Sequence, residues 1–278
     1  MSIDHERRYN PRTTVHDRQT IAARWDVVSQ RVRSDSRCRL DIAYGAGPME
    51  KLDLFLPEGP VRALLVFIHG GYWRANDKQD FAFLTPAFTR AGVAVALPNY
   101  SLCPAVTVDA IVTQMLQACA WLYRNGRHFG APPGDLVVSG HSAGGHLTAM
   151  MMAALWPQVA TDLPADVVRT GISFSGIYDV RPLMQVESIN SEVRLTDAMA
   201  TKVSPALLPP ATSAPLHTFV GADENEGFHL QNTLIGEAWP AVVRHHPDIP
   251  GANHFTLLDH IADPLSTLNR DLLDLIVR

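Results

Sequence analysis

Short, uninterrupted apolar runs separated by longer helical patterns are the feature that most restricts how this chain can fold. A run that is apolar throughout is typical of a strand buried on both faces, and such runs cover 63–68, 93–97, 136–139, 171–174 and 217–220. Helical patterns alternate with them, near 79–91, 107–125, 143–155, 227–238 and 263–277. Because strand alternates with helix, we expect an α/β fold with a mostly parallel sheet and helices on both faces.

Two segments depart from this alternation. Leu40–Tyr44 and Leu52–Leu56 flank a Gly-Ala-Gly-Pro turn, which predicts an antiparallel hairpin at the front of the sheet. Segment 181–214 is too long for a simple connection, so we expect an inserted lid or cap with a helix near 190–202. Since no repeat or linker divides the chain, we expect one domain over residues 1–278.

Residues 1–38 are expected to form a helical leader. Ile21, Trp25, Val28 and Val32 recur at helical spacing and predict an amphipathic helix over roughly 19–33. Two interpretations stay open. The helix is either a solvated element packed by this one stripe, or a cap over the mouth of an active site.

Composition excludes several classes of partner. The formal net charge is −5 and no basic stripe is interleaved with aromatic residues, so neither nucleic acid nor an anionic membrane is expected to bind. The three cysteines have unrelated spacings, which indicate neither a disulfide framework nor a zinc site. The amino terminus lacks the apolar stretch of a signal peptide, so we expect a cytoplasmic protein.

One long uncharged stretch, 136–161, could span a bilayer by length alone. It is interrupted by a cluster of Gly, Ser and His over 139–146, and the apolar part that follows is too short to span. We therefore expect a buried strand, a tight turn and a buried helix in this stretch.

The turn in that stretch carries the strongest catalytic signal. Gly140-His141-Ser142-Ala143-Gly144 fits G-x-S-x-G, the pattern of a nucleophile elbow. A predicted strand leads into it and a predicted helix follows. This is the setting in which a serine hydroxyl is held exposed on a strained turn, so Ser142 is the candidate nucleophile.

A serine nucleophile needs a histidine base that a carboxylate orients. In this class of fold the acid and then the histidine follow the serine along the chain, each after a strand. Asp223 comes directly after the run 217–220, and His254 lies 31 residues later. We favour Asp223 over its neighbours Glu224 and Glu226 as the acid, and His254 as the base.

Three other histidines are weaker candidates for the base. His245 and His246 lie in or just after a short apolar strand near 241–244 and are expected to be a surface or packing pair. His260 is expected at the start of the last helix.

The oxyanion of an acyl-transfer intermediate needs backbone N–H donors that are already in place. His69-Gly70-Gly71-Tyr72-Trp73 follows directly after the predicted strand 63–68. The donors are expected from Gly70, Gly71 or Tyr72, with Gly71 and Tyr72 favoured. The amide of Ala143, which follows the nucleophile, is expected to join them.

Motifs spread over nearly the whole chain resemble the kynurenine formamidase-like (arylformamidase) branch of the α/β-hydrolases. HGGYW at 69–73 fits the HGGxW signature of that branch. Further matching segments are 9–11, 44–55, 99–104, 140–147, 175–179 and 253–255. Tyr72 stands where related esterases usually carry a third glycine, HGGG, and this favours the formamidase-like branch.

This resemblance implies an α/β-hydrolase fold and a metal-independent serine hydrolase, and it would place the protein in tryptophan catabolism. The expected substrate is a small-molecule aryl formamide, with a general short-acyl carboxylesterase or a carbamate or amide hydrolase as alternatives and a non-catalytic binding module less favoured. No cofactor is expected, and a homodimer is left open. Candidate pocket residues, beside Tyr72, are His69, Trp73, Tyr178, Phe228 and Phe255.

Overall fold

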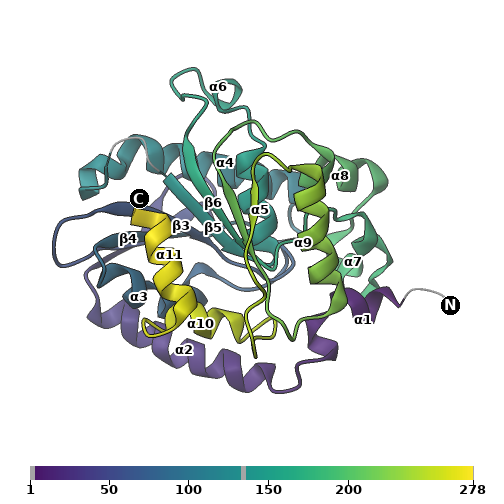
Figure 1. Cartoon of the computed structure of the whole chain (residues 1–278). Helices are drawn as coiled ribbons and strands as arrows, with labels where there is room; N and C mark the ends of the chain where they lie inside the picture. Colours follow the sequence, from purple (N-terminus) through teal and green to yellow (C-terminus); the bar gives the residue numbers. More distant parts are fainter. Residues whose placement is uncertain (1–3, 133–135, 278) are drawn as a thin grey trace.

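A central eight-stranded sheet organises the molecule, of which the computed structural model describes residues 4–132 and 136–277 (Figure 1). The strand order is β1-β2-β4-β3-β5-β6-β7-β8, and β2 alone runs against its neighbours. The strands are β1 Cys38–Ala43, β2 Lys51–Phe55, β3 Ala63–Ile68, β4 Val93–Pro98, β5 Leu136–His141, β6 Val168–Phe174, β7 Leu216–Phe219 and β8 Val243–His245. The predicted mixed sheet with an antiparallel hairpin is confirmed.

Alternation along β3 shows how two cores form on the two faces of the sheet. Leu64, Val66 and Ile68 face one core, and the residues between them face the other. The first core is covered by α4 Val108–Asn125, α5 Ala143–Met152 and α9 Glu226–Ala238. The second is covered by α2 Arg18–Asp35, α3 Thr85–Thr89, α10 Leu257–Ala262 and α11 Thr267–Val277.

Most predicted helices are present with small changes of boundary. The pattern near 79–91 divides into the 3₁₀ helix η2 (Lys78–Leu84) and α3. Short elements that the sequence analysis did not anticipate are η3 Gly126–Phe129 and α6 Trp156–Val159. Among the helices of the described residues, none is long and apolar enough to cross a membrane.

Segment 181–214 lies between β6 and β7 and consists of short helices. These are η4 Arg181–Gln185, α7 Glu187–Val193, α8 Asp197–Lys202 and η5 Pro205–Leu207. The single helix predicted near 190–202 is interrupted at Arg194, where the backbone is left-handed with φ 57°. Leu183, Val186 and Ile189 are buried in the first core, so the segment is packed onto the fold. Its action as a lid stays a prediction.

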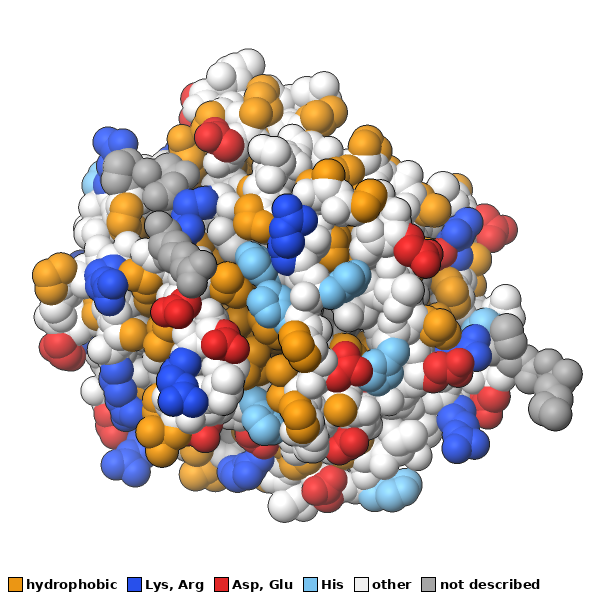
Figure 2. All heavy atoms as spheres, in the orientation of Figure 1, with side chains coloured by type: hydrophobic (Ala, Val, Ile, Leu, Met, Phe, Trp, Pro, Cys, Tyr) orange, Lys and Arg blue, Asp and Glu red, His pale blue; other side chains and the backbone are white. Residues whose placement is uncertain are grey.

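The leader wraps around the edge of the molecule. It consists of α1 His5–Tyr9, η1 Pro11–Thr13 and α2, and α1 lies beside α9 and η4 (Figure 1). Charged side chains follow the lower edge of the molecule, where α2 lies, in agreement with a helix packed by one stripe (Figure 2).

Candidate active site

Ser142 occupies a strained turn between β5 and α5. Its backbone has φ 58° and ψ −116°, a region that costs a non-glycine residue on the order of 1–3 kcal/mol. The turn is held by a hydrogen bond from the Ser142 amide to the Phe174 carbonyl, 2.8 Å. A Cβ added at Gly144 would lie 1.9 Å from the carbonyl oxygen of Ile68, so only glycine lets α5 approach β3 this closely. The predicted elbow geometry is therefore present.

His254 is oriented by a buried glutamate. Its Nδ1 lies 2.7 Å from Oε2 of Glu224, and the two side chains are 5% and 0% exposed. The other oxygen of this carboxylate accepts hydrogen bonds from the Ser175 hydroxyl and, at 2.8 Å, from the Gly221 amide. The carboxylate is therefore fixed by three donors, as an acid that orients an imidazole requires.

The prediction that Asp223 orients this imidazole is wrong. Asp223 is exposed, whereas Glu224 points inward. The Glu224 amide bonds the Gly221 carbonyl at 3.2 Å, which closes a tight turn after β7. Asp223 lies in the outer part of that turn, and the next residue returns to the sheet. The alternative Glu226 lies on α9 and pairs with Arg8 on the surface.

The competing histidines lie elsewhere. His245 contacts the Thr218 hydroxyl and His246 contacts His217, as expected for a packing pair at the last strand. His260 lies in α10, with the last helix α11 beginning at Thr267. None of these three lines the cavity that holds Ser142 and His254.

His141, inside the elbow, supports the loop that carries His254. Its Nε2 lies 2.8 Å from the His254 carbonyl oxygen, and the two ring centroids are 4.5 Å apart. Burial, followed by the nearby His254, holds the pKa of His141 well below its usual value. A neutral His141 can donate its Nε2 proton to that carbonyl. Phe228 stacks on the imidazole of His254, with 4.2 Å between the ring centroids.

The loop after β3 is also strained. Gly71, Tyr72 and Trp73 have φ values of 120°, 50° and 57°. A Cβ at Gly71 would meet the Ala75 carbonyl oxygen at 2.3 Å. In the part of the chain that the structure describes, the amides of Gly70, Gly71, Tyr72 and Ala143 donate no hydrogen bond. Gly70 and Gly71 line the cavity beside Ser142, so this loop brings unpaired donors to the candidate nucleophile.

Two predicted pocket residues of this loop are structural anchors. His69 is 1% exposed, stacks on Tyr100 and lies 3.1 Å from the Asn99 side-chain oxygen. Trp73 is fully buried, and its indole N–H donates to Nδ1 of His146 at 3.2 Å.

The hydrogen-bond chain from Trp73 continues into the inserted segment. His146 Nε2 lies 2.6 Å from the Val203 carbonyl and donates to it, since Nδ1 already accepts from the indole. Burial lowers the pKa of His146 to about 4, which keeps this imidazole neutral. The chain thus joins the loop after β3, helix α5 and the segment between β6 and β7.

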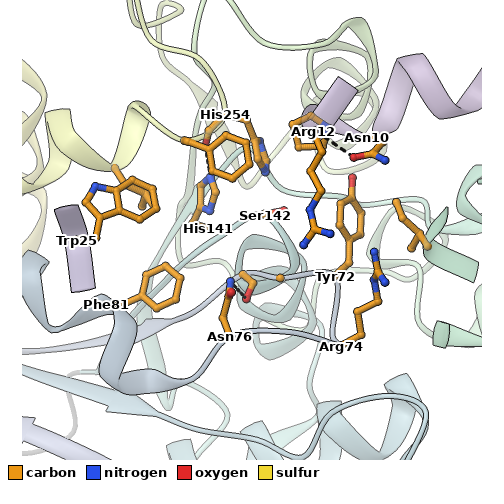
Figure 3. Close-up of a pocket in the computed structure, with 16 residues that line it drawn as sticks. Asn10, Arg12, Trp25, Tyr72, Arg74, Asn76, Phe81, His141, Ser142 and His254 are labelled. Carbon is orange, nitrogen blue, oxygen red and sulfur yellow. Dashed lines mark hydrogen bonds between the residues drawn. The ribbon is translucent and has the colours of Figure 1, made fainter. Parts of the chain in front are cut away.

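A cavity of about 100 Å³, partly open to solvent, holds Ser142 and His254 (Figure 3). Trp25 and Phe81 line it on one side, and Asn10, Arg12, Tyr72 and Arg74 on the other (Figure 3). Phe255 and Leu258 also line it, and Phe255 shares a neighbouring hollow with Trp25 and Phe81. Its remaining lining comes from Pro11, Gly70, Gly71, Asn76, His141 and Ile189.

Of the five candidate pocket residues, Phe255 alone lines this cavity in the described structure. Tyr178 is buried, and its hydroxyl donates to the Ser173 hydroxyl at 2.8 Å; Phe228 lies behind His254. The leader has features of both interpretations, the packed helix and the cap. Ile21 and Val32 are buried in the second core, whereas Trp25 lines the cavity.

Several lining residues had no signal in the sequence. Arg12 and Arg74 lie outside every motif of the sequence, and Phe81 falls within the helical pattern near 79–91. Trp25 could have been found through the cap interpretation. Its ring is held by Asp259 of α10, which accepts the indole N–H at 2.7 Å.

Comparison with known proteins places these features in a family. The model of the BD-FAE family matches residues 52–212, more than half of the chain. A kynurenine formamidase of Danio rerio is 26% identical over 97% of this chain and 92% of its own length. One from Drosophila melanogaster is 32% identical over 60% of this chain and 55% of its own.

A solved structure agrees over the full length. The crystal structure of a putative thioesterase from Silicibacter sp. TM1040 is 31% identical, covers 100% of both chains and superposes with a TM-score of 0.86. This chain is therefore a hydrolase that belongs to the BD-FAE family, within the kynurenine formamidase-like branch of the α/β-hydrolases.

Proposed function

We propose that the protein hydrolyses an aryl formamide with Ser142 as nucleophile, His254 as general base and Glu224 as the orienting acid. One observation carries this proposal. A serine on a strained turn shares a cavity with an imidazole that a fully buried carboxylate fixes through Nδ1. With Nδ1–H donating to Glu224, Nε2 is left as the free base, which is the tautomer that removes a proton from a serine.

The chemistry follows from these positions. His254 Nε2 takes the hydroxyl proton as Ser142 Oγ attacks the formyl carbon, and the oxyanion is bound by the amides of Gly71, Tyr72 and Ala143. The C–N bond then breaks, and His254 gives its proton to the departing arylamine. Water, deprotonated by the same imidazole, hydrolyses the formyl ester, so that formate leaves and the serine is regenerated.

The choice of an aryl formamide rests on two supports. Two curated relatives that align over 97% and 84% of this chain are named kynurenine formamidases. The apolar side of the cavity offers the rings of Trp25, Phe81 and Phe255, which suit a flat aromatic leaving group.

The test is a steady-state rate on N-formylkynurenine beside p-nitrophenyl acetate, with Ser142→Ala as the control. We expect both substrates to be turned over by the wild type and the variant to lose at least about a thousandfold in kcat. Formamide hydrolysis that survives in Ser142→Ala would contradict the role of the serine. Ester turnover without any formamide turnover would contradict the proposal that an aryl formamide is the substrate.

A short-acyl esterase is the second candidate, and the relationship to the putative thioesterase favours it. Esters and thioesters need the same nucleophile and oxyanion donors. Their alkoxide or thiolate leaving group, however, depends less than an arylamine on protonation by His254. A bell-shaped pH profile on formamides, against a profile with only the base limb on activated esters, would separate the two activities.

A further inference from the structure

Ser175 is a buried and strained serine beside the acid of the proposed triad. It follows the last residue of β6, is 2% exposed and has a backbone φ of 49°. That left-handed conformation is unfavourable for serine, whereas glycine adopts it freely. The Ser175 amide donates to the Phe219 carbonyl at 2.8 Å, which fixes the residue against the end of β7. A side chain kept at such a position is expected to have a use.

The Ser175 hydroxyl is directed at the carboxylate of Glu224. It donates to Oε1, which also accepts the Gly221 amide at 2.8 Å, while Oε2 lies 2.7 Å from Nδ1 of His254. The Gly221 amide belongs to the same turn as Glu224, but Ser175 comes from the neighbouring strand. Its hydroxyl therefore ties the acid to the sheet.

Neutral donors stabilise most of the negative charge of Glu224. In the part of the chain that the structure describes, this carboxylate forms an ion pair with His254 and with no lysine or arginine. Arg12 and Arg74 line the other side of the cavity, where Arg74 pairs with Glu192. Because the Glu224 side chain is fully buried, bulk water does not reach it. A buried anion of this kind depends on each hydrogen bond to its charged form.

Other titratable groups around this pair bring no compensating charge. Burial, and then the nearby His254, hold the pKa of His141 at the end of β5 well below its usual value. Burial, and then the charge of Glu224, raise the pKa of Tyr72 in the loop after β3. On the loop that carries the acid itself, Asp223 and Glu226 are exposed. The donors to the carboxylate therefore govern the charge state of the pair.

We propose that Ser175 is a positioning residue that keeps Glu224 oriented and ionised, so that His254 is available as a base near neutral pH. This inference rests on the proposed function for the roles of Glu224 and His254. A donor at Oε1 favours the form of the pair that carries one negative charge and a neutral imidazole. Without this donor that form is less stable, so the pair takes up a proton at a higher pH and the base is lost there.

The test is the pH dependence of kcat/KM on p-nitrophenyl acetate in Ser175→Ala, from about pH 5 to about pH 9. We expect the acid limb to move to higher pH by about one unit, which is a loss of about tenfold near about pH 6 and a small loss at about pH 9. A residue that only supported the fold would lower the activity by a similar factor at every pH.

Two further substitutions separate the hydroxyl from the strain. Ser175→Gly removes both, so it should show the shifted limb of Ser175→Ala but unfold at a higher urea concentration than that variant. Ser175→Cys keeps a weak S–H donor and should shift the limb less.

Ser173→Ala is the matched control on the same strand. Ser173 is also fully buried, and its hydroxyl accepts a hydrogen bond from the Tyr178 hydroxyl at 2.8 Å. Its loss removes a buried hydrogen bond that does not involve the acid, so the acid limb should stay where it is in the wild type.

Two results would overturn the role of Ser175. They are an acid limb at the wild-type pH in both Ser175→Ala and Ser175→Gly, and an equal loss of activity at every pH. Glu224→Gln in the same assay distinguishes failure of the proposed function. If the triad assignment is wrong, Glu224→Gln keeps wild-type activity. If only the role of Ser175 is wrong, Glu224→Gln is strongly impaired and the Ser175 variants keep the wild-type profile.

Discussion

The strand-end loops and the leader both contribute to the cavity, but their residues are constrained in different ways. The loops around Ser142 and Gly71 hold backbone in left-handed conformations against the sheet, where an added methyl group collides with a carbonyl. The leader contributes side chains, Trp25 and Arg12, from helices with ordinary backbone. In the proposed mechanism, backbone geometry thus holds the groups that make bonds, whereas the groups proposed to contact the leaving group are side chains that pack over the cavity.

The largest effect is expected from removing the charge of Glu224, the carboxylate that holds His254, and comparing the result with the same change at its neighbour Asp223. Glu224→Gln keeps the shape of the side chain but no longer fixes or stabilises the protonated imidazole. We expect kcat to fall by on the order of a thousandfold. Asp223→Asn is the matched control and should leave kcat nearly unchanged, because Asp223 is exposed and Glu224 holds His254. A larger loss in Asp223→Asn would restore Asp223 as the acid.

A methyl group at Gly71 tests the backbone constraint in the second loop. Gly71→Ala puts a Cβ against the Ala75 carbonyl at a φ of 120°, so the loop must shift. If its amides bind the oxyanion, kcat should drop on the order of a hundredfold with little change in KM. The measurement is steady-state kinetics with p-nitrophenyl acetate. Gly59→Ala, where nothing lies within 4 Å, is the control. A rise in KM alone would argue against oxyanion binding.

Loss of a leader side chain should weaken binding of an aromatic substrate and leave the rate of the chemical step nearly unchanged. Trp25→Ala removes an aromatic wall, so we expect kcat/KM on N-formylkynurenine to fall about tenfold, mostly through KM. On ethyl acetate, which does not reach that wall, the change should be small. Val28→Ala on the same helix is exposed and serves as the control. Equal losses on both substrates would mean that Trp25 supports the catalytic groups.

The last prediction concerns the stability of the folded protein and its dependence on pH. His146 has a pKa of about 4 in the folded protein, below the ordinary value of 6.5. Between these values the unfolded chain binds more protons, so stability is full above about pH 6.5 and falls as the pH decreases. At about 1.4 kcal/mol per pH unit, His146 accounts for up to about 3 kcal/mol.

Urea unfolding of wild type and His146→Gln at pH 7 and pH 5 measures this contribution. The variant should lose less stability between the two pH values, since glutamine does not titrate. His141 is also held neutral by burial, so part of the slope should remain. An unchanged slope in the variant would contradict the neutral state of His146.

Features that a backbone constraint imposes could be predicted from sequence. The elbow, the HGG loop and the apolar strands all require particular residue types at fixed spacing, and the structure has them at the predicted places. The choice between Asp223 and Glu224 could not be predicted, because it depends on where a four-residue turn closes. A shift of one residue reverses which carboxylate faces inward.

The cavity lining was largely beyond prediction for a related reason. The polar atoms of Trp73 and Tyr178 form hydrogen bonds with buried partners, and both side chains pack behind the loops. An aromatic residue near the end of a strand can equally well be buried in this way or line a pocket, so its position in the sequence does not decide between the two. Arg12 and Trp25 reach the cavity through contacts with residues far along the chain, and no local spacing records such contacts.

Those distant contacts have a consequence for the order in which the molecule can assemble. Asn225 donates to the Arg7 carbonyl at 2.7 Å and Arg8 pairs with Glu226, in each case across a sequence separation of 218. A nascent chain delivers the leader first, yet these partners emerge only after most of the sheet has been synthesised. Such long closures are slow, so in refolding we expect the catalytic serine to become reactive before discrimination among substrates is restored.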